Sequence, residues 1–121
     1  MNPYKEITQY LFSQFPQYQK IGKKAYKADL TNIRKLVAIL DYPEKKLNCV
    51  HVAGTNGKGS VSHLMGSILQ EAGYKVGIFT SPHLIDFKER IKINGKTIDE
   101  EFIIDFVNKH KITFEKLGIS F

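Results

Sequence analysis

One stretch decides the fold of this chain: Cys49-Val50-His51-Val52-Ala53-Gly54-Thr55-Asn56-Gly57-Lys58-Gly59-Ser60. Residues 49–53 form a short, nearly continuous apolar run, as expected of a strand that is buried on both faces of a parallel sheet. Residues 54–60 form a glycine-rich turn. The apolar residues that follow recur at helical spacing: Val61, Leu64, Met65, Ile68, Leu69 and Ala72. The sequence therefore predicts a buried strand, a tight turn and an amphipathic helix in succession.

A second apolar run extends this pattern. Val76, Ile78 and Phe79 predict another buried strand after the helix. Residues 49–80 then make one strand–helix–strand unit, with the length that a right-handed crossover between parallel strands requires. We expect an α/β fold with a parallel sheet and flanking helices.

The segment before residue 49 predicts two helices. The first should begin at Pro3 with Asn2 as its N-cap, and the second should span the apolar positions 30–40, with Asp29 as its cap. Between them, residues 17–28 form a basic connector. This connector is either a solvated surface or a patch that attracts an anionic substrate.

The segment after residue 80 predicts a hairpin and a helix. Asn94-Gly95 stands between apolar residues, which is the signal for a type I′ turn. Asp99 is the expected N-cap of the last helix, and Glu100 and Glu101 lie in its first turn. Its apolar face should contain Phe102, Ile103, Phe106 and Val107.

Composition restricts the class of protein. The 121 residues suffice for one domain, and 42% hydrophobic with 25% charged residues is typical of a soluble globular chain. A single cysteine excludes a disulfide scaffold, and no signal peptide or membrane-spanning run is visible, so we expect a cytoplasmic protein. The net charge of +6 indicates an anionic partner. A nucleic acid is one alternative, although no RNA-binding or zinc-finger signature is present.

The glycine-rich turn carries residues suited to binding phosphate. Glycines let backbone amides approach a phosphate, and the following helix points its N-terminal amides and positive dipole at the same place. Lys58 can reach the β- and γ-phosphates, and the Ser60 hydroxyl can bind Mg²⁺. The regular G-x-x-x-x-G-K-[ST] spacing is absent, because it requires glycine at Val52 and a hydroxyl at Gly59. A turn used only for helix packing is the alternative, but it explains Lys58 poorly.

At these residues the chain resembles the ATP-dependent amide ligases of the Mur ligase superfamily. Their phosphate loop has the form G-T-x-G-K-[GT]-[ST], which residues 54–60 fit throughout. Thr80-Ser81-Pro82-His83-Leu84 and Glu89-Arg90-Ile91 look like the second block of one branch, the folylpolyglutamate synthase/dihydrofolate synthase family. The resemblance covers about residues 28–98, and its two motifs occur in the right order at the right separation.

The resemblance implies roles for particular residues. Lys58 would be catalytic, Mg²⁺ would be bound by Ser60 and Ser81, and ATP would be held by Asn56, Gly57, Lys58, Gly59 and Ser60. The implied reaction joins the carboxylate of dihydropteroate or a folate to the amino group of L-glutamate through an acyl phosphate. It converts ATP to ADP and phosphate, and it depends mainly on positioning and charge neutralisation. Dihydropteroate, folylpolyglutamate or both remain open as substrates.

The resemblance also implies how much of the protein this chain represents. Residues 1–121 would be the N-terminal part of a Mur ligase central, ATP-binding domain, truncated after the first strand–helix–strand unit and the hairpin. The remainder of that domain and the C-terminal domain would be absent, so we expect no ligase activity from the chain alone. Its exposed sheet edges should favour self-association. The alternatives are another P-loop NTPase or phosphotransferase, and a basic non-enzymatic anion-binding module.

Five other residues are weaker candidates. Cys49 and His51 lie in the predicted buried strand, so we expect an inert thiol and a packed histidine. His63 is expected on the polar side of the helix after the turn, and His110 on the last helix. Neither has a second histidine or cysteine at metal-ligand spacing. His83 should do no more than line the substrate side.

Overall fold

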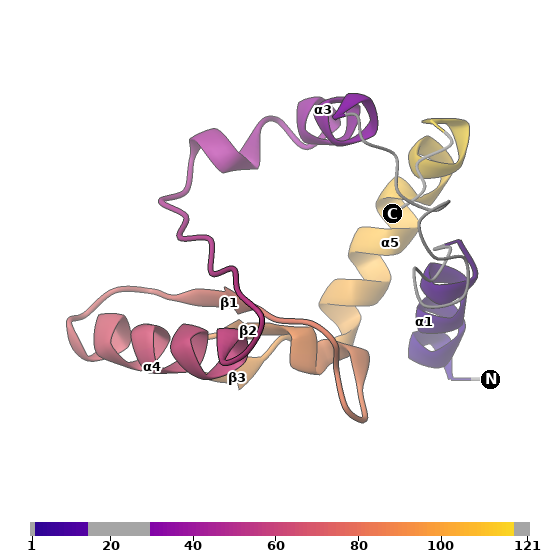
Figure 1. Ribbon diagram of the computed structural model, residues 1–121. Helices are drawn as coiled ribbons and strands as arrows, with labels where there is room; N and C mark the ends of the chain where they lie inside the picture. Colours follow the sequence, from indigo (N-terminus) through magenta and orange to yellow (C-terminus); the bar gives the residue numbers. More distant parts are fainter. Residues whose placement is uncertain (1, 15–29, 118–121) are drawn as a thin grey trace. The chain divides into compact units, whose positions relative to one another are not determined.

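The computed structural model describes residues 2–14 and 30–117 (Figure 1). Its elements, with η for a 3-10 helix, are α1 (Pro3–Gln14), α3 (Thr31–Ile39), η2 (Pro43–Lys45), α4 (Lys58–Glu71), β1 (Gly77–Phe79), η3 (Phe87–Arg90), β2 (Ile91–Ile93), β3 (Lys96–Thr97) and α5 (Glu100–Leu117). They form two compact units, the first made of Met1–Cys49 with Ile104–Phe121 and the second of Val50–Ile103. The basic connector 17–28 and the expected cap Asp29 lie outside the described residues.

The first unit is helical. The side-chain oxygen of Asn2 accepts a hydrogen bond from the backbone N–H of Tyr4 at 2.9 Å, so α1 begins with the predicted cap. The Tyr10 hydroxyl donates to Oε1 of Glu115 at 3.1 Å and ties α1 to α5. The predicted second helix is confirmed as α3. The buried apolar side chains of this unit come from three helices: Tyr4, Ile7, Leu36 and Val107.

The second unit contains a three-stranded antiparallel sheet in the order β1-β2-β3. Gly77 pairs with Ile93 and Phe79 with Ile91, so a strand, β1, is present after the helix as predicted. The prediction that this strand is buried is wrong, because its residues are exposed or half-buried in the described part of the chain. The predicted hairpin is also confirmed. Asn94 and Gly95 have φ values of 48° and 76°, as a type I′ turn requires, and they connect β2 to β3.

The described residues form an antiparallel sheet and not the predicted parallel one. Residues 49–53 have no strand assigned, Cys49 and His51 are exposed, and Val50 is 68% exposed. The predictions of a buried strand, a packed histidine and a buried thiol are therefore wrong for this chain. A parallel strand needs hydrogen-bonded neighbours and cover on both faces, and in the described residues β1 pairs with β2 instead.

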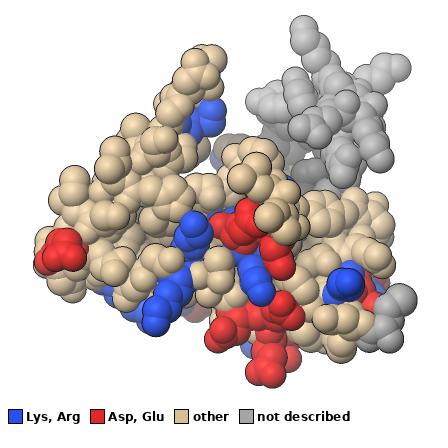
Figure 2. Space-filling model, turned by 90° about the horizontal axis from the view of Figure 1, so that it is seen from below, with Lys and Arg blue, Asp and Glu red and all other residues tan. Residues whose placement is uncertain are grey.

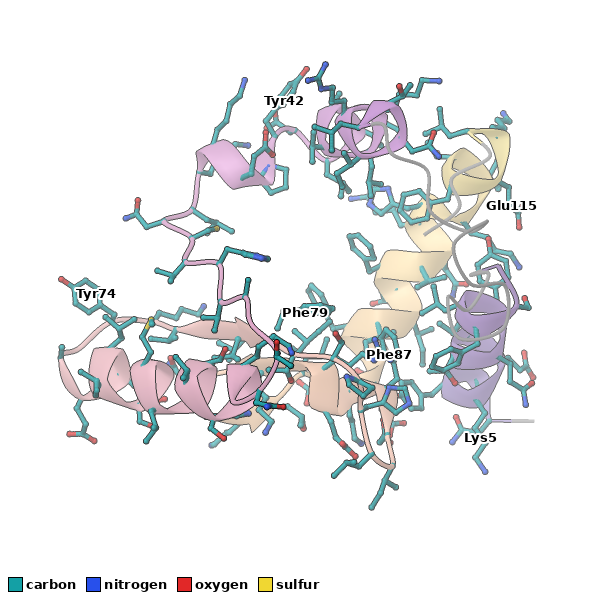
Figure 3. All side chains as sticks on the ribbon, in the orientation of Figure 1. Lys5, Tyr42, Tyr74, Phe79, Phe87 and Glu115 are labelled. Atoms are coloured by element: carbon teal, nitrogen blue, oxygen red, sulfur yellow. The ribbon has the colours of Figure 1, made fainter. Side chains whose placement is uncertain are left out.

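Helix α4 packs along one face of the sheet (Figure 1). Gly66 is buried at this contact, and a Cβ placed on it would lie 2.5 Å from Cδ1 of Ile78 in β1. Because side chains alternate along a strand, Phe79 faces the opposite side, where it is 69% exposed (Figure 3). Part of the predicted apolar face of α4 is also exposed: Val61, Leu64 and Ile68. Within the described residues, a helix therefore covers one face of this sheet.

The last helix begins where the sequence predicts. Helix α5 starts at Glu100, directly after Asp99, and has two glutamates in its first turn. Ile103 and Val107 of its predicted apolar face are buried, whereas Phe102 is 63% exposed. No helix in the described part of the chain is long and apolar enough to cross a membrane.

Candidate functional site

The glycine-rich turn leads directly into the N-terminus of α4. Gly57 is the N-cap residue, and its φ of 77° lies in the left-handed region that favours glycine. Its carbonyl accepts the first helical hydrogen bond, from the N–H of Val61 at 2.9 Å. The N–H groups of the first helical turn have no partner within a helix, and residues 54–60 are exposed. This geometry is typical of loops that bind phosphate or other anions.

Lys58 folds back over the loop that precedes it. Its Nζ donates to the carbonyl oxygen of Gly54 at 2.7 Å and to that of Thr55 at 3.3 Å. The ammonium group and the N-terminus of α4 therefore place positive charge on the same short loop. Asn56, Gly59 and Ser60 are exposed beside it, and nothing within 4 Å would meet a Cβ at Gly59.

The second predicted motif lies in the loop between β1 and η3. Ser81 is exposed two residues after the end of β1, and the Ser81–Pro82 peptide bond is cis. Figure 1 shows that β1 ends at the same side of the second unit as the N-terminus of α4. The structure thus places the loop that contains Ser81 after the strand end nearest to the glycine-rich turn.

His83 is half-buried among neighbours from η3. Its Nδ1 accepts a hydrogen bond from Nε of Arg90 at 2.7 Å. The ring of Phe87 lies edge-on to the imidazole, with centroids 6.1 Å apart, and the Arg90 guanidinium is 5.7 Å from the Phe87 ring centroid. Because Nδ1 accepts, the proton of a neutral His83 is on Nε2.

Sequence reasoning missed the part that Glu89 plays in this loop. The backbone N–H groups of Leu84, Ile85 and Asp86 donate to its carboxylate at 2.9, 3.0 and 2.8 Å. These bonds lower the pKa of Glu89 below its ordinary value, and the bond from Leu84 has the largest effect. The signal was present in the sequence, because Asp86 and Glu89 have the spacing of a capping box and form one here.

Charged side chains join η3 to the start of α5. Nζ of Lys88 lies 2.9 Å from Oε1 of Glu100 and 4.0 Å from Oδ2 of Asp86. The hydrogen bond to Glu100 raises the pKa of Lys88. Acidic and basic side chains lie next to one another on the face seen in Figure 2, so charge is mixed there.

The donor set fits a magnesium ion that is shared with a nucleotide. No group of three histidine, cysteine or acidic side chains that could hold a metal occurs in residues 2–14 and 30–117. The exposed hydroxyls of Ser60 and Ser81 offer hard oxygen donors. Mg²⁺ in nucleotide sites takes few protein ligands and completes its shell with phosphate oxygens and waters, so two hydroxyls are compatible with it.

The weaker histidine candidates lie outside this region. His63 is exposed on α4, as predicted. His110 in α5 stacks on Phe114 with ring centroids 5.6 Å apart and lies 4.8 Å from the centroid of Phe106. Its aromatic neighbours indicate a packing role.

The glycine-rich loop, its lysine and the helix N-terminus form a loop–helix unit of the class that binds anions. No protein-family model matches the chain. The chain is 50% identical over 95 residues to the dihydrofolate synthase/folylpolyglutamate synthase of Bacillus subtilis (strain 168), a match that covers 78% of the chain and 22% of the relative.

Solved structures match the fold as well. Folylpolyglutamate synthetase from Lactobacillus casei matches with a TM-score of 0.80 at 32% identity, over 97% of this chain and 27% of that one. An FPGS–AMPPCP–folate complex matches with a TM-score of 0.79 at 34% identity, over 97% and 27%. The chain is thus a relative of the folylpolyglutamate and dihydrofolate synthases and matches their N-terminal region. It spans about a fifth to a quarter of their length.

Proposed function

We propose that this chain is the phosphate-binding part of an ATP-dependent ligase that adds L-glutamate to dihydropteroate or a folate. The observation that carries the proposal is the glycine-rich loop, which ends in left-handed Gly57 at the start of α4 and holds the Lys58 ammonium on its carbonyls. The names of the relatives support a glutamate ligase, and the FPGS–AMPPCP–folate complex supports binding of ATP and a folate.

In this proposal the loop binds the nucleotide through its backbone. The N–H groups of Lys58, Gly59 and Ser60 would point at the phosphates, since they lie in the first turn of α4, and those of Asn56 and Gly57 directly precede it. Lys58 would exchange the carbonyls of Gly54 and Thr55 for phosphate oxygens, and its charge would offset the negative charge that grows on ADP as the γ-phosphoryl group is transferred. The substrate carboxylate attacks the γ-phosphorus of ATP, the bond to the β–γ bridging oxygen breaks, and ADP leaves as the acyl phosphate forms. The amine of L-glutamate then attacks the acyl carbon, loses a proton and displaces phosphate to give the amide.

The hydroxyls of Ser60 and Ser81 would hold Mg²⁺ beside these phosphates. The ion supplies charge neutralisation and alignment of the phosphate oxygens when bound. Ser60 contributes from the first turn of α4, and Ser81 from the loop after β1.

The proposal extends to the sheet. In the whole ligase, residues 49–53 form a strand of a parallel sheet whose other strands come from further chain, and residues 1–121 are the N-terminal part of that domain. The exposed side chains of Val50 and Phe79 support this, because both are apolar and lack cover in the described residues. A chain with such surfaces would self-associate when alone. We place the ligase in the cytoplasm, because the single cysteine of this chain suits a reducing compartment.

Calorimetric titration of the chain with Mg-AMPPCP tests the proposal. Lys58→Ala should weaken binding by about 10- to 100-fold, because a hydrogen bond to a charged group contributes about 1.5–3 kcal/mol. Lys75→Ala is the matched control, because Lys75 is an exposed lysine of the same unit outside the loop. Equal affinities of the wild-type chain and Lys58→Ala would contradict the assignment of the loop.

A further inference from the structure

Polar contacts rather than burial hold the loop that contains Ser81. Leu84 and Ile85 are 91% and 92% exposed, and Ser81 and Pro82 are exposed as well. An exposed loop gains little from the hydrophobic effect, so its conformation depends on its hydrogen bonds. The partners of those bonds therefore determine where the Ser81 hydroxyl lies.

Glu89 holds the second half of the loop. Its Oε2 accepts from the N–H of Leu84, and its Oε1 accepts from the N–H groups of Ile85 and Asp86. One carboxylate thus satisfies three consecutive backbone donors, all within 3.0 Å. Charge-assisted bonds of this kind are stronger than bonds between neutral groups.

Arg90 holds the first half of the loop. Its carbonyl oxygen accepts the N–H of Thr80 at 2.9 Å, and its Nε donates to Nδ1 of His83 at 2.7 Å. The two residues on either side of Ser81-Pro82 are therefore both bound to Arg90. Two residues between fixed ends have little freedom, so the contacts of Arg90 restrict the position of Ser81.

We propose that Glu89 and Arg90 are positioning residues, which hold the loop of residues 80–86 so that Ser81 presents its hydroxyl to the metal ion of the bound nucleotide. The inference rests on the proposed function, because it gives Ser81 the part of a metal ligand. Neither residue touches the nucleotide in this scheme. Their effect passes through Ser81.

Nucleotide titrations with and without magnesium separate this role from a general structural one. Arg90→Gln and Glu89→Gln should each weaken binding of Mg-AMPPCP about 10-fold or more, as loss of an outer-shell partner does at metal sites. They should leave binding of metal-free AMPPCP unchanged. In a Ser81→Ala background they should have no further effect, because the hydroxyl that they position is gone. Arg34→Gln, which removes an exposed arginine of the other unit, is the control for charge.

Nuclear magnetic resonance of the nucleotide-free wild-type chain tests the contacts of Glu89 and Arg90 with the loop. This measurement does not depend on whether a variant folds. Slow exchange of the amides of residues 84–86 and a His83 ring protonated on Nε2 alone are the expected results. Fast exchange of these amides, or a ring protonated on Nδ1, would overturn the inference. The inference would also be overturned if Arg90→Gln and Glu89→Gln weakened AMPPCP binding equally with and without magnesium. Losses of affinity that add to that of Ser81→Ala would overturn it as well. Wild-type chain that binds no AMPPCP would overturn the proposed function and the metal role of Ser81 together, whereas failure of the variants alone would overturn only the inference.

Discussion

Substitution of Gly66 by alanine measures how closely α4 packs on β1. The new Cβ would lie 2.5 Å from Cδ1 and 3.3 Å from Cγ1 of Ile78, so the isoleucine side chain must move. Alanine gains about 1 kcal/mol of helix propensity over glycine, whereas overpacking costs about 1–3 kcal/mol. We expect Gly66→Ala to lower the free energy of unfolding by about 1 kcal/mol, taking the middle of these ranges.

A double-mutant cycle by urea denaturation checks the cause. Ile78→Val removes the atom closest to the new Cβ and should by itself cost about 0.5–1.5 kcal/mol. In the Ile78→Val background, Gly66→Ala should be neutral or stabilising by up to about 1 kcal/mol, since propensity is then the larger effect. Gly59→Ala is the control in the same helix, because nothing within 4 Å would meet its Cβ. The same cost for Gly66→Ala in both backgrounds would refute the packing argument.

Two further predictions concern the turn and the acid stability of the second unit. Asn94→Ala should cost about 1–2 kcal/mol, because it loses the bond from the Val76 N–H to Oδ1 and puts alanine at a φ of 48°. Asn94→Gly should cost less, since glycine tolerates that φ, and equal losses in urea denaturation would show that the backbone conformation is unimportant. The pKa of Glu89 is lowered by the N–H groups of Leu84, Asp86 and Ile85, so its stabilisation is complete above about pH 4.5 and disappears as the pH falls through the folded-state pKa. Glu89→Gln should remove this acid dependence, and wild-type and variant curves that stay parallel between about pH 3 and 6 would rule out the contact.

Elements whose cause is local could be predicted from the sequence. The periodic apolar residues of α4 and the Asn94-Gly95 turn act over a few neighbouring positions, and both elements are present. The pairing of β1 with β2 could not be predicted in this way, because both strands are short and nothing in their spacing says which partner is chosen. Likewise, the apolar run of residues 49–53 predicted a strand, but an apolar run does not say which strand it pairs with, and these residues do not form a strand in the structure.

The same distinction between local and non-local contacts applies to the candidate site. The glycine-rich turn that carries Lys58 and the helix after it could be predicted, because they are continuous in sequence, and Gly57 is the left-handed N-cap. The contacts that hold the Ser81 loop could not be predicted, because they depend on how Glu89 and Arg90 fold back on the residues before them. The Glu89-Arg90-Ile91 block is part of the resemblance to a known family, whereas the contacts of Glu89 and Arg90 depend on the folded loop.

The exposed pair Leu84 and Ile85 has a consequence for proteolysis. Both side chains are almost fully exposed, and exposed loop tips are common sites of proteolytic nicking. A protease must also pull the backbone into an extended form and bind its amides, but the three amides of residues 84–86 already donate to Glu89. The loop therefore offers recognisable side chains on a backbone that resists cleavage, and its peptide bonds will be cut more slowly than their exposure suggests.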